Sequence, residues 1–184
     1  MGARADPEED NAMEIRILTA DDAGEFRRLR LEALERDAEA FGSSAEEHRA
    51  LSMDEIKARL APDPAEHFVM GAFADGQLGG TAGFFRERPV KQRHKGRIWG
   101  VYVTPGMRGA GAGRRLLQAV LERAAAIEGL EQIALSVSTT QDAAMTLYRS
   151  LGFESFGCER RSLKIGDRYF DEEYMVLRLG AGEV

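Results

Sequence analysis

The feature that most constrains this chain is a run of alternating glycines between two segments of different periodicity. Residues 97–103 are rich in β-branched and aromatic side chains and favour a strand, whereas apolar residues recur at helical spacing over 116–127. The run between them, residues 108–113, reads RGAGAG. Glycines at such a turn let consecutive backbone N–H groups converge on an anion at the helix N-terminus. The pattern predicts an α/β fold with an anion-binding loop, and a plain turn before a helix is the alternative.

Positive charge collects at the start of the same predicted helix. Arg108, Arg114 and Arg115 flank the glycines, where the helix macrodipole disfavours cations unless an anion is bound. Two common phosphate loops do not match this pattern. The loop of nucleotide hydrolases ends in Gly-Lys-Ser/Thr, whereas this one ends in Gly113-Arg114-Arg115. The dinucleotide fingerprint is G-x-G-x-x-G after the first strand, whereas this chain has G-x-G-x-G late in its sequence.

Two segments of the chain together resemble a known family. Residues 101–113 (VYVTPGMRGAGAG) resemble the acetyl-coenzyme A motif of the GNAT superfamily of N-acetyltransferases, whose pattern is Arg/Gln-x-x-Gly-x-Gly/Ala. Residues 144–153 (AMTLYRSLGF) resemble the second motif of the same superfamily. The resemblance covers roughly residues 13–179. It implies a single α/β domain with a mixed, mostly antiparallel central sheet flanked by helices.

The resemblance implies a role for each part of the two motifs. In this superfamily the strand before the glycine loop splays from its neighbour, so the backbones of Val101, Tyr102 and Val103 would bind the pantetheine arm of acetyl-coenzyme A. The pyrophosphate would lie on the loop residues Arg108, Gly109, Ala110, Gly111, Ala112, Gly113 and Arg114. Tyr148 aligns with a tyrosine that often protonates the departing thiolate. Gln141 aligns with the asparagine that commonly begins the second motif, and its longer stem is a departure.

The implied reaction is attack of a primary amine on the acetyl thioester within a ternary complex. It requires the positioning of both reactants, removal of a proton, stabilisation of an oxyanion and protonation of sulfur. Backbone N–H groups of the opened strand are candidate oxyanion donors and Tyr148 is the candidate acid, with a core tyrosine as the alternative. Glu46, Glu47 and Glu87 are candidate bases acting through water, and a solvated surface acid is the simpler interpretation of each.

The periodicity elsewhere predicts one domain over residues 13–184, after an extension at 1–12 that we expect to be disordered. The predicted helices besides that after the glycines are one that buries Phe26, Leu29, Arg30 and Ala33, one at 52–60 and one at 141–151. The predicted strands are 15–18, 67–74, 77–85, 97–103 and 132–138, with a hairpin of 153–165 and 169–179. Residues 40–44 lie where the superfamily varies to recognise the acceptor, and a simple connection between helices is the alternative.

Charge and hydropathy exclude several classes of function. The 184 residues carry a net charge of −6, which argues against general affinity for nucleic acid or anionic membrane. Six basic residues over 86–97 are expected to form a solvated turn, since seven strand residues at ~3.3 Å each place them roughly 20 Å from the glycine loop. No apolar run approaches the ~18 residues of a membrane-spanning helix.

The cysteine and histidine content bears on compartment and cofactors. Cys158 is the single cysteine, so no disulfide closes within the chain and we expect a cytoplasmic protein. His48, His67 and His94 lack metal-ligand spacing with one another or with Cys158, so we expect no metal.

Several choices stay open in the sequence. The acceptor amine is either a small molecule or a protein, and a homodimer is one option for the assembly. A longer acyl donor is a variant of the same chemistry. The rival from another class is a non-catalytic module that binds acyl-coenzyme A on the same fold.

Overall fold

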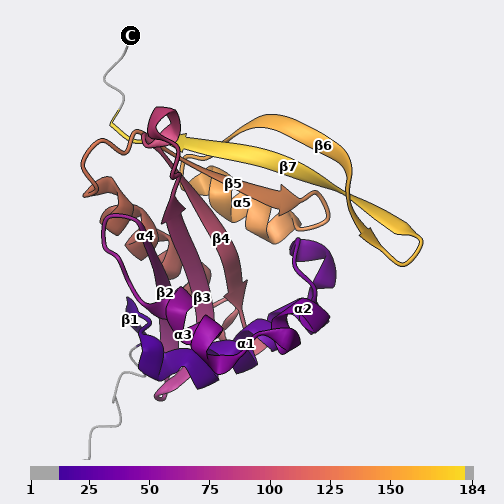
Figure 1. Ribbon diagram of the computed structural model, residues 1–184. Helices are drawn as coiled ribbons and strands as arrows, with labels where there is room; N and C mark the ends of the chain where they lie inside the picture. Colours follow the sequence, from indigo (N-terminus) through magenta and orange to yellow (C-terminus); the bar gives the residue numbers. More distant parts are fainter. Residues whose placement is uncertain (1–12, 181–184) are drawn as a thin grey trace, which may run out of the picture.

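The computed structural model describes residues 13–180 and shows a seven-stranded sheet with helices on both faces (Figure 1). The strands are β1 (Glu14–Ile17), β2 (His67–Ala74), β3 (Gln77–Arg86), β4 (Lys95–Val103), β5 (Gln132–Ser138), β6 (Glu154–Ile165) and β7 (Arg168–Arg178). The α-helices are α1 (Ala23–Arg36), α2 (Ala45–Ala50), α3 (Met53–Leu60), α4 (Ala112–Ala125) and α5 (Asp142–Ser150). Over this part of the chain, no helix is long and apolar enough to cross a membrane.

The strand order of the sheet is β1-β2-β3-β4-β5-β7-β6. The β4–β5 pair is parallel and the other neighbouring strands are antiparallel. β4 pairs with β5 over Lys95–Arg97 against Gln132–Ala134, and beyond this point the two strands diverge (Figure 1). The mixed, mostly antiparallel sheet implied by the family resemblance is confirmed, and so is the splaying of the strand that precedes the glycine loop.

Two apolar cores lie on opposite faces of the sheet. On one face α4 buries Leu116 and Leu117 completely, against side chains of the central strands. On the other face α1 packs with α3, and the predicted buried face of α1 is confirmed at Phe26, Leu29, Arg30 and Ala33. Full burial of a large apolar side chain stabilises a fold by about 1.5–3 kcal/mol. The two cores therefore hold α1 and α4 on opposite sides of β4.

One helix, α2, was not predicted. Its N-cap is Ser44, whose hydroxyl accepts a hydrogen bond from the Glu47 N–H at 3.1 Å, while the Glu47 carboxylate accepts one from the Ser44 N–H at 2.7 Å. This capping box was visible in the sequence, but six residues are too few to show a helical apolar period. The same box formed by Ser52 and Glu55 begins α3, which was predicted.

The end of α4 also differs from the prediction. The helix ends at Ala125, whereas the helical apolar spacing continues to residue 127. Ile127 and Leu130 are both buried against the core although they follow the helix, and Gly129 has the left-handed φ of +72° in the turn between them. The apolar pattern therefore predicted the buried residues correctly but predicted too long a helix.

The basic stretch over residues 86–97 forms a turn between β3 and β4, and two of its six basic side chains are ion-paired within the protein. Arg93 forms an ion pair with Glu66, and the Arg97 Nε donates to Glu87 at 2.7 Å. Val90 near the tip is 89% exposed. The structure thus agrees with the prediction of a solvated turn.

Candidate active site

The diverging ends of β4 and β5 border a cavity of about 480 Å³. Its walls come from residues 98–103 of β4, residues 135–137 of β5, the loop at 107–114 and the face of α5 that carries Tyr148. The segment after α1 closes another side through Asp37, Ala40 and Phe41. Of the residues that the family resemblance assigned to the coenzyme or to the acid role, all except Ala110 line this cavity. Positions that are separated by up to 47 residues of sequence are thus brought together.

The glycine loop presents an open row of backbone donors. Gly109 and Gly111 both have φ of +80°, and Gly111 is the N-cap of α4. A Cβ added at Gly111 would meet no atom within 4 Å, so the space beside the loop is open. Within residues 13–180 the N–H groups of residues 109–114 find no acceptor, and the first bond of the helix runs from Arg115 N–H to the Gly111 carbonyl. Free N–H groups at a helix N-terminus favour an anion such as a pyrophosphate.

The three arginines of the loop are engaged with the protein. The Arg108 Nε donates to the Val103 carbonyl at 2.8 Å and its Nη2 donates to Asp37 at 2.7 Å. Arg114 donates to the Ser150 hydroxyl at 2.8 Å and Arg115 to the Met13 carbonyl at 2.8 Å. The Val103 carbonyl, expected to be free for the pantetheine arm, is therefore occupied, and in this arrangement the loop backbone is the open anion-binding group.

Tyr148 lies in the same cavity on α5. Its side chain is 6% exposed and packs edge-on against Phe153, with ring centroids 6.0 Å apart. None of the residues 13–180 forms a hydrogen bond with its hydroxyl, and burial raises the pKa of that hydroxyl above its usual range. A buried phenol of this kind remains protonated at neutral pH and can donate a proton to a group in the cavity.

Comparison with known proteins agrees with this geometry. Residues 29–153 match the model of the acetyltransferase (GNAT) family, which places the splayed strand, the glycine loop and α5 inside the matched region. The chain belongs to the GNAT family. A GNAT-family acetyltransferase from Streptococcus pneumoniae has the same fold, with a TM-score of 0.82, 25% identity, and coverage of 92% of this chain and 100% of that one.

The chain spans about 64% of the length of two curated relatives that it matches. This GNAT chain is 37% identical over 108 residues to the N-alpha-acetyltransferase RimI of Mycobacterium tuberculosis, covering 58% of this chain and 64% of the relative. It is 34% identical over 111 residues to an L-methionine sulfoximine/L-methionine sulfone acetyltransferase of Pseudomonas aeruginosa, covering 60% and 64%. A phosphinothricin acetyltransferase from Sinorhizobium meliloti, solved with AcCoA, shares the fold at a TM-score of 0.78 and 22% identity, with 91% and 89% covered.

Gln141 and the candidate bases of this GNAT domain differ in their placement. Gln141 is the N-cap of α5 and lines the cavity, and its side chain does not cap the helix. None of Glu46, Glu47 and Glu87 lines the cavity. The Glu47 carboxylate accepts the Ser44 N–H, which lowers its pKa, and Glu87 is bound to Arg97. The three acids therefore lack the position of a base.

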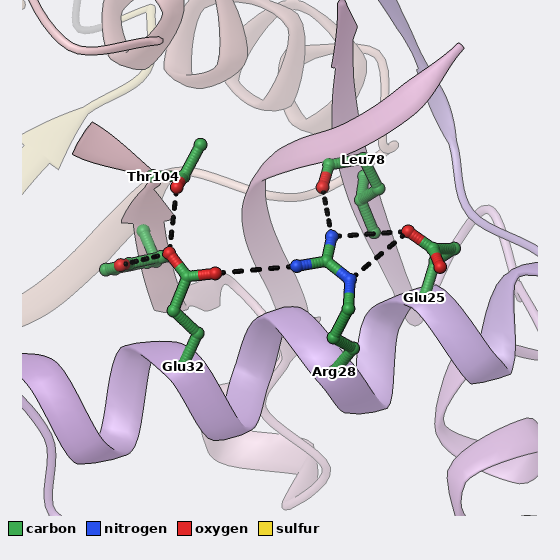
Figure 2. Close-up of polar contacts among 6 residues, drawn as sticks. Glu25, Arg28, Glu32, Leu78 and Thr104 are labelled. Carbon is green, nitrogen blue, oxygen red and sulfur yellow. Dashed lines mark hydrogen bonds and ion pairs between the residues drawn. The ribbon is translucent and has the colours of Figure 1, made fainter. Parts of the chain in front are cut away.

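The sequence also missed a polar network beneath the site. Figure 2 shows Glu32 of α1 reaching across to the end of β4. Its Oε1 accepts hydrogen bonds from the Tyr102 hydroxyl at 2.9 Å and the Thr104 hydroxyl at 2.8 Å, while Arg28 pairs with Oε2 at 3.4 Å and donates to the Leu78 carbonyl at 2.8 Å. This network fixes α1 to the residues from which the glycine loop begins.

The same network sets the protonation of its members. Burial raises the pKa of Tyr102 to about 12, and the hydrogen bond to Glu32 acts in the same direction. Burial opposes ionisation of Glu32, but the hydrogen bonds from Thr104 and Tyr102 outweigh it and lower the pKa of the carboxyl. The network thus consists of a neutral phenol and an ionised carboxylate. The i,i+4 spacing of Arg28 and Glu32 indicates an ion pair on a helix and is visible in the sequence. No pattern in the sequence indicates their other partners, which lie in β3 and at the end of β4.

Proposed function

We propose that this protein transfers the acetyl group of acetyl-coenzyme A to a primary amine, by direct attack in a ternary complex. The observation that carries the proposal is the meeting, in one cavity, of the unpaired loop N–H groups, the splayed edge of β4 and the Tyr148 hydroxyl. The names of the curated relatives, an N-alpha-acetyltransferase and an acetyltransferase of methionine derivatives, support the same reaction class.

The residues of the cavity fit the coenzyme. The N–H groups of residues 109–114 bind the pyrophosphate, and the open space beside Gly111 admits it without a side-chain clash. The backbone of Val101 and Tyr102 binds the pantetheine arm where β5 has left β4. When bound, the coenzyme supplies an activated acetyl thioester. Gln141 lines the same cavity and adds an amide.

Three steps then remain for the protein. Backbone N–H groups on the cavity edge of β4 stabilise the oxyanion, and Tyr148 donates its proton to the departing sulfur. Among the described residues that line the cavity, Asp37 is the one carboxylate, and it is ion-paired with Arg108. The acceptor ammonium therefore loses a proton to water rather than to a side-chain carboxylate, and the neutral amine that results attacks the thioester.

Two measurements test the proposal. Acetyl-coenzyme A at a hundredfold excess over its Kd should stabilise the fold by about 2.7 kcal/mol, which raises Tm by several degrees. A screen of amine acceptors should then show release of free thiol. No thermal shift at millimolar coenzyme would overturn the proposal, as would a shift with a dinucleotide in its place. A shift without thiol release from any acceptor would favour the non-catalytic binding module.

A further inference from the structure

Arg30 on α1 is a buried guanidinium without an acidic partner. Its side chain faces the sheet and the residue is 8% exposed. Its Nη1 is buried and has no hydrogen-bond partner, and in the described part of the chain no carboxylate forms an ion pair with it. Buried charges in proteins are ordinarily paired because desolvation without a partner is costly. An unpaired cation in this position indicates an anion that the protein alone does not supply.

The guanidinium lies directly behind the wall of the proposed active site. Its central carbon is 4.5 Å from the ring centroid of Phe41 and 6.0 Å from that of Trp99. Its Nη1 is 3.4 Å from the position that a Cβ on Gly100 would occupy. Phe41, Trp99 and Gly100 all line the cavity. Arg30 therefore approaches the cavity from the α1 face of the sheet, opposite to the face that carries α4.

The groups around Arg30 are also basic. His48 on α2 is 3% exposed, and its Nε2 is buried without a hydrogen-bond partner. Burial, together with the charges of Arg30 and Arg59, lowers the pKa of His48 to about 4. Burial also lowers the pKa of Arg30 to about 10, with Arg59 acting in the same direction. Within residues 13–180, aromatic rings but no carboxylate lie against this positive charge.

We propose that Arg30 binds the carboxylate of the acceptor, so that the acceptors of this enzyme are amino acids or closely related amino carboxylates. The proposal rests on the proposed acetyl transfer and names its substrate class. A guanidinium fork matches the two oxygens of a carboxylate. Phe41 lies between the 3-10 turn at Ala38–Ala40 and α2 and separates Arg30 from the cavity, so the proposal requires its ring to turn aside when the carboxylate binds. The amine of the acceptor then extends past Gly100 toward the thioester.

The first experiment measures binding without turnover. Protein saturated with free coenzyme A, which has no acetyl group to transfer, is titrated calorimetrically with the common amino acids and with their carboxamides. Each carboxamide keeps the amine and the side chain and loses only the carboxylate charge. We expect at least one amino acid to bind, and its carboxamide to bind at least about 30-fold more weakly. Equal binding of every acid and amide pair, or no binding of any amino acid, would overturn the proposal.

Variants of the helix then locate the effect. Arg30→Gln should abolish the preference for the acid, Arg30→Lys should keep part of it, and Arg36→Gln, an exposed change on the same helix, should leave it unchanged. An acid preference that survives in a folded Arg30→Gln protein would contradict the assignment. If Arg30→Gln does not fold, the Arg30→Lys variant and the acid and amide pairs decide the question.

The outcome is distinct from that of the acetyl-transfer test. Binding of amino carboxylates without acetyl transfer would retain the Arg30 proposal as a binding site and defeat the proposed enzyme. Acetyl transfer to amines that carry no carboxylate, with no preference for amino acids, would retain the proposed enzyme and defeat the Arg30 proposal.

Discussion

The α4 face and the α1 face of β4 contribute to the cavity in different ways. On the α4 face, the anion cradle is one uninterrupted stretch of chain from the end of β4 to the first turn of α4, and its open groups belong to the backbone. On the α1 face, the cavity wall and its support are assembled from side chains of distant segments. Glu32 and Tyr102 are 70 residues apart, and Arg30 contacts the rings of Phe41 and Trp99.

This difference corresponds to two tasks of the fold, recognition of the coenzyme and recognition of the acceptor. A coenzyme that is the same in every member of a family can be recognised by backbone geometry, which many side-chain sequences support. An acceptor that differs between members has to be recognised by side chains, and these are placed by tertiary packing. Changes on the α4 face should therefore affect the coenzyme, and changes on the α1 face should affect the acceptor or the stability of the fold.

The largest expected effect comes from Gly111→Val in the glycine loop. A valine at φ of +80° would be strained, and its side chain would fill the space where we place the pyrophosphate. The affinity for acetyl-coenzyme A should fall by at least about 100-fold by calorimetry. Gly76→Val is the matched control, since Gly76 has φ of +74°, equally open surroundings, and a place in the distant β2–β3 turn. Equal coenzyme affinity of the two variants would reduce the glycine loop to a plain turn.

The next effect concerns the chemical step on the same side. Tyr148→Phe keeps the buried ring and removes the hydroxyl, so turnover should fall by about 10- to 100-fold while coenzyme affinity changes little. The rate must be measured with a good acceptor under conditions where chemistry is limiting. Tyr169→Phe, at an exposed position of the β6–β7 hairpin, serves as the control. Unchanged turnover in Tyr148→Phe would make Tyr148 a core residue.

A pH effect is expected on the α1 face. The pKa of His48 is lowered by burial to about 4, below its usual value near 6.5. Between these values the unfolded chain binds a proton that the folded chain does not, so stability is complete above about pH 6.5 and is lost as pH falls toward 4. The free energy of unfolding should fall by about 2 kcal/mol through this group. Urea unfolding of wild type and His48→Asn over this pH range measures the difference, and parallel curves would contradict the prediction.

The smallest effect is expected at the network of Figure 2. Glu32→Gln keeps one acceptor oxygen but removes the charge that binds Arg28 and accepts two hydroxyl groups. The free energy of unfolding should fall by about 1 kcal/mol, and the coenzyme Kd should change by less than about twofold. Glu122→Gln, exposed on α4, makes the same charge change without a network. A coenzyme defect larger than the stability defect would break the proposed separation of the two faces.

The same difference between the two faces explains how much the sequence could predict. The strand, the glycine loop, α4 and Tyr148 were predicted because their signals are local, either a period or a motif within a few residues. The overall order of elements followed in the same way, apart from α2. Residue Arg30 was placed correctly on the buried face of α1, but the sequence did not show that it would lack an acid.

The structure places the three candidate bases outside the cavity. A carboxylate looks the same in the sequence whether it faces a cavity, caps a helix or pairs with an arginine. Glu47 is used by the capping box of α2, and Glu87 is used by Arg97. The capping box of Glu47 was visible within four residues of sequence, whereas the pairing of Glu87 with Arg97 joins residues ten positions apart and appears only in the fold.

The short pairing between β4 and β5 has a mechanical consequence. Three residue pairs join the half of the sheet built from β1–β4 to the half built from β5–β7. In the proposed complex, a pantetheine arm along the unpaired edge of β4 would take the place of the missing strand pairs and connect the two halves of the sheet. The proposed coenzyme would thus stabilise the contact between the two halves of the sheet as well as supply the acetyl group.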